Sequence, residues 1–533
     1  MPGRSGLPWR IVKWTVSVAA VLTLVVTGGG IWVYSALRVS NVGELSFGNE
    51  LHVPPELEPA VDEDGRKRFD LTMQEGTSEF LPGQETGTWG VNGAYLGPTM
   101  RLERGDDVAM DVTNDLPETS TLHWHGMRVP AAMDGGPHQE IEPGEEWAAE
   151  WTVDQPAASL WYHPHLHGAT AEHVYRGVAG MIIVEDDDVT EGLPADYGVD
   201  DVPLVVQDRA FRSDGELDLN ATGPLWTQAT YGLMGDEILV NGTHDPYFEV
   251  EGERVRFRVL NGSNTRSMNF GLDDDRAFQL VGTDTGLLDV PVDLDRIRLS
   301  PGERAEIVVD FAPGDDVVLR SYAPKQAGSF AEDRLSGSDD EFDILHLTAA
   351  EELGPSDPVP AELATTPEIT APEGATERVF SLEGTAHING DSMDMSRVDE
   401  VVPAGTTEIW TIENPSVVHN FHIHDVAFRV LDIDGAEPPP ELRGRKDTVY
   451  VAPQTSVRIA VEFGEHVDPE TPYMYHCHLL EHEDQGMMGQ FLVVEPGTED
   501  EVELDLGLDG GHDHADGHGD GGGQGHADGH GDH

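Results

Sequence analysis

Residues 471–488 read TPYMYHCHLLEHEDQGMM and contain Cys477, the single cysteine of the 533-residue chain. The approach from Thr471 to Tyr475 is apolar and aromatic, which predicts a β-strand, and successive side chains on a strand leave opposite faces. Cys477 can therefore face one metal ion while His476 and His478 face others.

The residues after this strand complete one of these sites. His482 and Met487 add an imidazole and a thioether to the Cys477 thiolate, and such a set holds the copper of a blue-copper electron-transfer centre. The alternative is a buried free cysteine that only fills space. A single cysteine also excludes an intramolecular disulfide.

Three further histidine pairs fall where strands, or the turns after them, are expected. They are His123 and His125, His163 and His165, and His422 and His424, with His419 three residues before the last pair. A lone His-x-His on an exposed strand is usually just solvated. Together with the cysteine stretch, however, these pairs supply enough ligands for one thiolate-bound copper and three imidazole-bound coppers.

These motifs resemble those of the multicopper oxidase family, in the three-domain form that includes bacterial laccases, bilirubin oxidases and copper-efflux oxidases. The resemblance covers about residues 45–498 and depends on HWHG at 123–126, WYHPH at 161–165, HNFHIH at 419–424 and HCHLLEHEDQGMM at 476–488. It implies cupredoxin-like Greek-key β-sandwich domains and a copper-dependent oxidoreductase. The expected reaction couples one-electron oxidation of a small reducing substrate to reduction of dioxygen to water.

The resemblance also implies four copper ions per chain and assigns their ligands. The expected type 1 ligands are His419, Cys477, His482 and Met487, and Cys477 is also the electron-transfer residue. The expected type 2 ligands are His123 and His422. The expected type 3 ligands are His125, His163, His165, His424, His476 and His478. Only the family spacing selects Met487 over its neighbour Met488.

Two carboxylates, Asp134 and Glu483, match family positions associated with proton delivery. The alternative for each is a carboxylate that orients a histidine ligand through a hydrogen bond. His138, His167 and His173 lie near ligands but match no ligand position, which favours a solvent-facing or supporting role for them.

An internal repeat predicts the architecture. Gly105–Asn114, Gly252–Asn261 and Gly405–Asn414 bracket alternating runs of the same length, and Pro-Gly at 143 and 301 or Pro-Gln at 453 follows each run. With 60 Gly and 35 Pro favouring turns, the pattern predicts an all-β chain of three sandwich domains. We place these domains at 45–190, 200–350 and 375–498, with a linker at 351–374.

The middle copy of the repeat lacks the imidazoles. His422 stands eight residues after Asn414, whereas Asn269 stands eight residues after Asn261. We therefore expect the middle domain to bind no copper and to space the other two domains so that their histidine pairs meet.

The two ends of the chain differ from the rest. Residues 14–37 are uncharged and mostly apolar, follow a basic segment at 1–13, and at about 1.5 Å per residue can cross a hydrocarbon core of about 30 Å. This predicts a transmembrane signal-anchor with the enzyme outside the cytoplasm at the cell membrane. A cleaved secretory signal, giving a secreted enzyme, is the alternative.

Residues 499–533 are acidic and rich in His and Gly, which predicts a disordered tail that either captures Cu(II) loosely or is simply solvated.

The charge balance restricts the partners. With 100 acidic against 31 basic residues the formal charge is −69, so nucleic acids and anionic lipid surfaces are poor partners of the soluble part. Concentrated salt would screen this repulsion, because the Debye length is about 3 Å at 1 M. A saline habitat is therefore a hypothesis.

The sequence says least about the substrate. The methionine-rich insert of copper-efflux oxidases is missing, and 414–418 lacks the carboxylate and methionine of cuprous-oxidising members. This favours a laccase-like oxidase of phenols or aromatic amines with an open type 1 edge at His482. Because a negative surface attracts cations, oxidation of Cu(I), Fe(II) or Mn(II) in copper tolerance is the alternative. A non-catalytic copper-binding scaffold is the third hypothesis.

Overall fold

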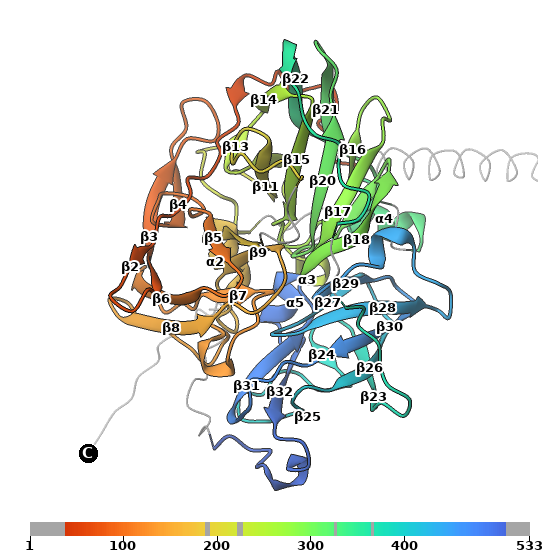
Figure 1. The fold of residues 1–533 in the computed structure, drawn as a ribbon. Coiled ribbons are helices and arrows are strands. Elements are labelled where there is room, and N and C mark those ends of the chain that lie inside the picture. The colour runs from red at the N-terminus through yellow and green to blue at the C-terminus, as the bar shows by residue number, and fades with distance from the viewer. Residues whose placement is uncertain (1–37, 187–191, 221–227, 325–327, 364–366, 508–533) are drawn as a thin grey trace, which may run out of the picture.

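The structure is a computed structural model and describes residues 38–186, 192–220, 228–324, 328–363 and 367–507. These residues are mostly β-strand, which confirms the predicted all-β class. The helices are short: α2 (Thr170–Arg176), α3 (Gln228–Tyr231), α4 (Phe330–Leu335) and α5 (Leu480–Asp484). Figure 1 shows three β-rich regions packed around a common centre, where α5 lies.

No helix in the described part of the chain combines the length and the apolar character needed to cross a membrane. The predicted anchor at 14–37 and all but the first residues of the predicted tail at 499–533 lie outside the described residues. The domain limits drawn from the sequence stay predictions.

The first region consists of two sheets that share one core, in which Leu71 packs with Leu102 and Ile182. One sheet has the order β2 (Ala60–Val61), β3 (Lys67–Ser78), β6 (Asp107–Asp115), β8 (Glu146–Thr152), with β4 (Thr86–Val91) beside β3. The other has the order β5 (Met100–Glu103), β10 (Gly180–Glu185), β9 (Ala158–His163), β7 (His123–His125).

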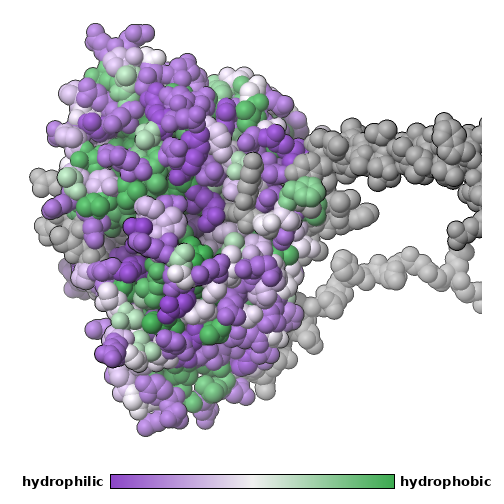
Figure 2. Space-filling view, turned by 90° about the vertical axis from the view of Figure 1, so that its right-hand side faces the viewer, coloured by the Kyte–Doolittle hydropathy of each residue, from purple (hydrophilic) through white to green (hydrophobic). Residues whose placement is uncertain are grey.

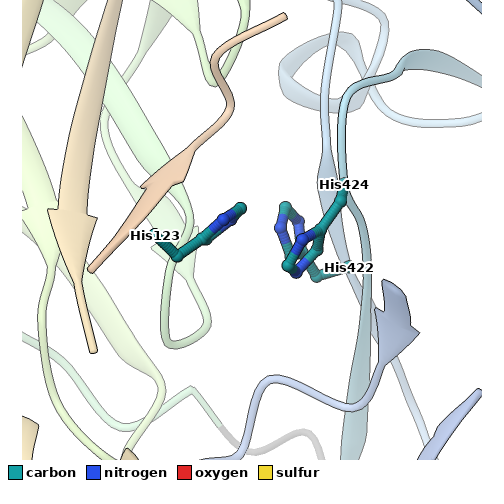
Figure 3. A group of neighbouring side chains, drawn as sticks. All are labelled: His123, His422 and His424. Carbon is teal, nitrogen blue, oxygen red and sulfur yellow. The ribbon is translucent and has the colours of Figure 1, made fainter. Parts of the chain in front are cut away.

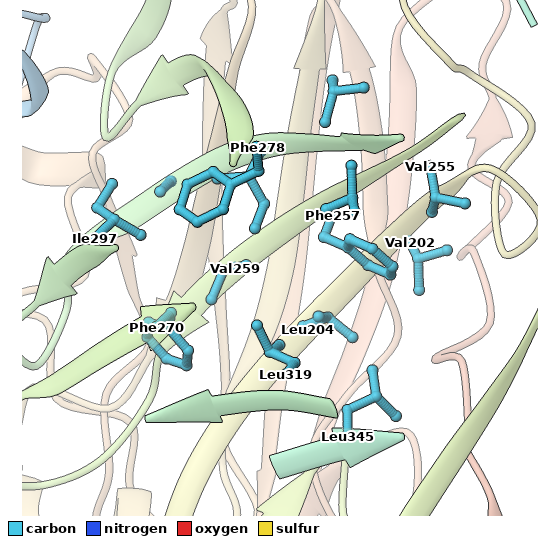
Figure 4. Close-up of a cluster of buried hydrophobic side chains, with 14 of the residues drawn as sticks. Val202, Leu204, Val255, Phe257, Val259, Phe270, Phe278, Ile297, Leu319 and Leu345 are labelled. Atoms are coloured by element: carbon cyan, nitrogen blue, oxygen red, sulfur yellow. The ribbon is translucent and has the colours of Figure 1, made fainter. Parts of the chain in front are cut away.

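The second region is built in the same way, and Figure 4 shows its core, where Val259 and Phe257 face Leu319 and Leu345. Its larger sheet has the order β13 (Thr243–His244), β12 (Glu237–Val240), β11 (Asp201–Arg209), β15 (Arg254–Asn261), β20 (Arg304–Asp310), β17 (Phe278–Thr283), β18 (Gly286–Leu294). Its second sheet has the order β1 (Asn49–Glu50), β14 (Pro246–Gly252), β22 (Phe342–Gly354), β21 (Asp316–Ser321), β16 (Met268–Leu272), β19 (Ile297–Leu299).

The third region contains the cysteine stretch, and Trp410, Tyr475 and Phe491 meet in its core. One sheet has the order β24 (His387–Ile388), β23 (Glu377–Glu383), β26 (Thr407–Asn414), β30 (Thr455–Glu462), β28 (Ala427–Ile433). The other has the order β25 (Glu400–Pro403), β32 (Met488–Val494), β31 (Asp468–His476), β27 (His419–Ile423), β29 (Thr448–Val451).

The repeated runs of the sequence occupy the same place in each region. They form β6, β15 and β26, each with a parallel neighbour on one side and an antiparallel neighbour on the other. The closing asparagine of each run uses its side chain identically. Asn114, Asn261 and Asn414 each donate to two backbone carbonyls and accept the backbone N–H two residues on. These buried contacts explain why the asparagine ends every copy, since an unpaired buried carbonyl is costly.

Candidate metal centre

The four histidine-bearing strands meet at the boundary between the first and third regions. Within the first region β7 pairs with β9, and within the third β27 pairs with β31. Across the boundary, His165 Nε2 lies 3.1 Å from His476 Nε2 and 3.2 Å from His424 Nε2. Figure 3 shows His123 facing His422 and His424 from the opposite region. The eight histidines expected at type 2 and type 3 copper form one buried cluster, hereafter the histidine cluster: His123, His125, His163, His165, His422, His424, His476 and His478.

Most rings in the histidine cluster are held through one nitrogen, which leaves the other free. The Nδ1 contacts with protein oxygens within 3.2 Å include His123 to Asp134 O (2.9 Å), His163 to Pro164 O (2.8 Å), His422 to Asp447 O (2.9 Å), His424 to Asp134 Oδ2 (2.7 Å) and His476 to Cys477 O (3.2 Å). A proton fixed on Nδ1 leaves the Nε2 lone pair free for a metal. The buried Nε2 atoms of His123 and His422 have no hydrogen-bond partner among the described residues, so the donor set fits metal ions in the space between the rings.

The protonation state of the cluster also suits a metal. Burial, followed by the neighbouring imidazoles, holds the pKa of His125, His163 and His422 well below the usual range. Burial lowers the pKa of His165 and of His478 to about 3. These rings are therefore neutral near pH 7, and neutral imidazole is the form that binds metal ions.

A second group, hereafter the thiol group, lies beside the histidine cluster and contains His419, Cys477 and His482. The Cys477 Sγ lies 3.4 Å from His419 Nδ1 and 3.7 Å from His482 Nδ1, and the two Nδ1 atoms are 3.1 Å apart. Met487 is fully buried in the same apolar cluster, and its carbonyl accepts the Cys477 N–H at 3.1 Å. Burial raises the pKa of the thiol to about 12, so a bound cation is needed to stabilise the thiolate.

The prediction of an open edge at His482 is wrong. The His482 side chain is fully buried, and its Nε2 lies 2.8 Å from the carbonyl oxygen of Thr230 in α3. The Leu233 N–H donates to Glu481 Oε1 at 2.7 Å, which holds the segment after α3 beside the thiol group. A segment of the middle region thus covers this edge, and because it lies about 250 residues from His482 in sequence, no local pattern indicated it.

The two predicted proton-delivery carboxylates each join histidines of the first and third regions. Asp134 Oδ2 lies 2.7 Å from His424 Nδ1, and Asp134 Oδ1 lies 3.4 Å from His123 Nδ1. Glu483 lies 3.2 Å from His476 Nδ1 and 3.5 Å from His165 Nδ1.

Two opposing effects act on Glu483. Burial would raise its pKa, but the contact with His476, whose Nδ1 lies 3.2 Å from the carboxylate, outweighs burial and holds the pKa well below its usual range. Both roles left open by the sequence, proton delivery and orientation of ligands, are compatible with these contacts.

A third carboxylate, which no sequence motif indicated, contacts the cluster. Asp447 Oδ1 lies 3.2 Å from His125 Nε2, and the next residue, Thr448, places Oγ1 3.2 Å from His422 Nδ1. The available signal was the charged pair at 446–447 directly before an apolar strand. Among the histidines expected to face solvent or to support ligands, His173 lies 3.0 Å from Ser120 Oγ and His138 lies 2.8 Å from Gln490 Oε1.

Comparisons with known proteins agree with this geometry. Sequence profiles described as multicopper oxidase match residues 72–189, 213–329 and 359–497. The multicopper oxidase mco of Staphylococcus aureus is 37% identical over 84% of this chain and 93% of its own length. The cell division protein FtsP of Escherichia coli (strain K12) is 38% identical over 83% and 92%.

Two solved structures are similar over most of their length. The laccase of Pediococcus acidilactici superposes with a TM-score of 0.75 at 34% identity, covering 84% of this chain and 94% of that one. A multicopper oxidase of Campylobacter jejuni, described as a metallo-oxidase, gives a TM-score of 0.74 at 26% identity, with 86% and 98% covered.

Proposed function

Since this chain belongs to the multicopper oxidase family, and is thus a copper-dependent oxidoreductase that uses dioxygen, we propose that it is a laccase-like oxidase of phenols or aromatic amines. The observation that most supports the oxidase chemistry is the position of Cys477 between two ligand groups. Its thiol lies in the thiol group, while its sequence neighbours His476 and His478 lie in the histidine cluster. Copper bound at the two groups would supply one-electron transfer and the four-electron reduction of dioxygen.

The proposed ligands follow the free donor atoms. His419, Cys477, His482 and Met487 would hold type 1 copper, and His123 and His422 would hold type 2 copper through Nε2. The remaining six rings of the histidine cluster would hold the type 3 pair, which gives four coppers per chain. Cys477 then provides a covalent path of a few bonds from the electron-accepting ligand group to the rings where oxygen is reduced.

Protons for dioxygen reduction would come through Asp134 and Glu483. Each carboxylate is buried and reaches Nδ1 atoms on both sides of the cluster. A carboxylate in this position can hand a proton inward while its hydrogen bonds keep the rings oriented.

Oxidation of metal ions is the second candidate function. One structural neighbour and the charge of the surface support it. The multicopper oxidase of Campylobacter jejuni is described as a metallo-oxidase, and an acidic surface raises the local concentration of cations. In this case the enzyme would serve copper tolerance by oxidising Cu(I), or would act on Fe(II) or Mn(II).

For location, we propose the cell membrane with the catalytic regions outside the cytoplasm, on the basis of the apolar run at 14–37. Release after cleavage of that run is the alternative.

Steady-state oxygen uptake by the copper-loaded protein tests the proposal over phenols, aryl amines, bilirubin, Cu(I), Fe(II) and Mn(II). We expect the highest kcat/KM with a phenol or aryl amine. Higher values with Cu(I) would favour the metallo-oxidase. The Cys477→Ser variant should lose the blue absorption and fall to the background of the copper-free protein, and equal activity of variant and wild type would remove the proposed electron path.

A further inference from the structure

One turn of the middle region lies directly against the histidine cluster. Asn420, which accepts the His478 N–H at 2.7 Å, donates to Pro301 O at 2.8 Å. Gly302, in the same turn, is so close to the His478 ring that a Cβ there would lie 3.1 Å from it. The residues at 300–304, hereafter the middle turn, therefore form part of the wall of the cluster.

Arg304 closes the middle turn and is fully buried, with all five guanidinium N–H groups in use. Nε donates to Ser159 O at 3.0 Å, Nη1 to Gly302 O at 2.9 Å and Nη2 to Asp284 O at 2.8 Å. The remaining two N–H groups form a fork on Asp447, with 2.8 Å to Oδ1 and 2.6 Å to Oδ2. Such a fork fixes the plane of the carboxylate as well as its position.

The carboxylate held by this fork lies against two proposed copper ligands. Asp447 Oδ1 lies 3.2 Å from His125 Nε2 and 3.7 Å from His422 Nδ1. The rings of His125 and His422 stack with centroids 3.8 Å apart. A shift of the Asp447 carboxylate would therefore move both rings at once.

The glycine of the first histidine motif makes room for this contact. Gly126 has φ +85°, and a Cβ there would lie 2.6 Å from Asp447 Oδ2 and 2.7 Å from Arg304 Nη2. All three regions therefore meet at one point: Gly126 from the first, Arg304 from the middle and Asp447 from the third.

We propose that Arg304 is a positioning residue for the proposed ligands His125 and His422, acting through Asp447. The inference rests on the ligand assignment of the proposed function and extends it, because the middle region, to which that function assigns no copper, then orients ligands as well as spacing its neighbours. Loss of such a supporting partner typically lowers the affinity for the metal about 10- to 100-fold.

Arg304→Lys tests the inference, because lysine keeps the charge but has three donors that cannot form the fork. In the copper-loaded variant we expect an altered EPR spectrum of type 2 copper. Competition with a chelator should also show that the variant binds this copper about 10- to 100-fold more weakly than the wild type does. The blue absorption per chain should stay at its wild-type value, because the thiol group does not contact Arg304.

Arg256→Lys is the matched control. Arg256 is also buried in the middle region, and its Nε and Nη2 both donate to Glu306. This variant should lose thermal stability but keep the wild-type EPR spectrum and copper affinity. The inference is overturned when a folded Arg304→Lys protein matches the wild type, or changes only as Arg256→Lys does.

A neutral double variant covers the case in which Arg304→Lys does not fold. Arg304→Met with Asp447→Asn removes both buried charges, which restores stability more readily than removing one. A wild-type EPR spectrum in this double variant would equally overturn the inference. A wild-type protein without any type 2 signal would instead remove the ligand assignment of the proposed function, and the inference with it.

Discussion

At the residue scale, one set of residues would bind copper and another set orients the rings that would bind it. The histidines and the cysteine would supply the donor atoms for copper, whereas Asp134, Glu483 and Asp447 contact one ring nitrogen of His424, His476 and His125. A carboxylate or carbonyl on one ring nitrogen leaves the other free for a metal.

Substituting the two proton-delivery candidates separates their roles. We expect Asp134→Asn and Glu483→Gln each to slow the reduction of dioxygen by about 10²- to 10⁴-fold, the range for loss of a positioned proton donor. Anaerobic reduction of type 1 copper by the substrate, followed in a stopped-flow instrument, should keep its wild-type rate. Loss of copper without a separate effect on dioxygen reduction would mean that the carboxylates only orient their histidines.

At the element scale, the turn that follows the repeated asparagine contact recurs in all three regions. Of these three turns, the one in the middle region packs against the histidine cluster. Gly144, Gly302 and Gln454 have φ values of +81°, +82° and +61°, and each N–H donates to the carbonyl of the repeated asparagine. The turn that precedes β20 is the one whose glycine packs on His478.

Gly302→Ala and Gly144→Ala form a matched pair for this turn. Both alanines must adopt a left-handed backbone, which costs roughly 1–2 kcal/mol. A Cβ at 144 meets nothing within 4 Å, whereas a Cβ at 302 lies 3.1 Å from the His478 ring. Both variants should melt at a lower temperature, but only Gly302→Ala should change the copper spectra. Identical spectra for the two variants would show that the contact with His478 has no influence.

At the scale of the whole molecule, buried charges join the regions. Asp284, Glu303 and Arg304 of the middle region enclose Lys446 and Asp447 of the third, with Lys446 Nζ 2.9 Å from Asp284 and 3.0 Å from Glu303. Three carboxylates thus share two cations. Burial raises the pKa of Asp284 to about 6, although Lys446 and Arg304 oppose it.

This raised pKa predicts a pH dependence of stability. The folded protein holds the Asp284 proton more tightly than the unfolded chain does. Raising the pH from about 4 to about 6 therefore lowers the free energy of unfolding by up to about 1.4 kcal/mol for each pH unit. The stability contributed by Asp284 is therefore lost as the pH rises through this window. The melting temperature of Asp284→Asn minus that of the wild type should rise from pH 4 to pH 6, and a constant or falling difference would contradict this.

The surface gives the second whole-molecule prediction. The face in Figure 2 is largely hydrophilic, and the chain has a formal charge of −69. Because the Debye length falls from about 30 Å at 0.01 M salt to about 3 Å at 1 M, added sodium chloride should raise the melting temperature. A melting temperature that stays level or falls over this range would argue against adaptation to salt.

The sequence by itself determined the β class, the internal repeat and the set of candidate donor atoms, because strand alternation and ligand chemistry are local properties that a spacing can reveal. The sequence could not show that Thr230 covers His482 or that Arg304 forms hydrogen bonds with Asp447, since residues far apart in sequence make these contacts. Such contacts arise only when the three regions pack together and each buried donor must find an acceptor. The tertiary structure therefore decided how the ligands are oriented and how closed the thiol group is to solvent.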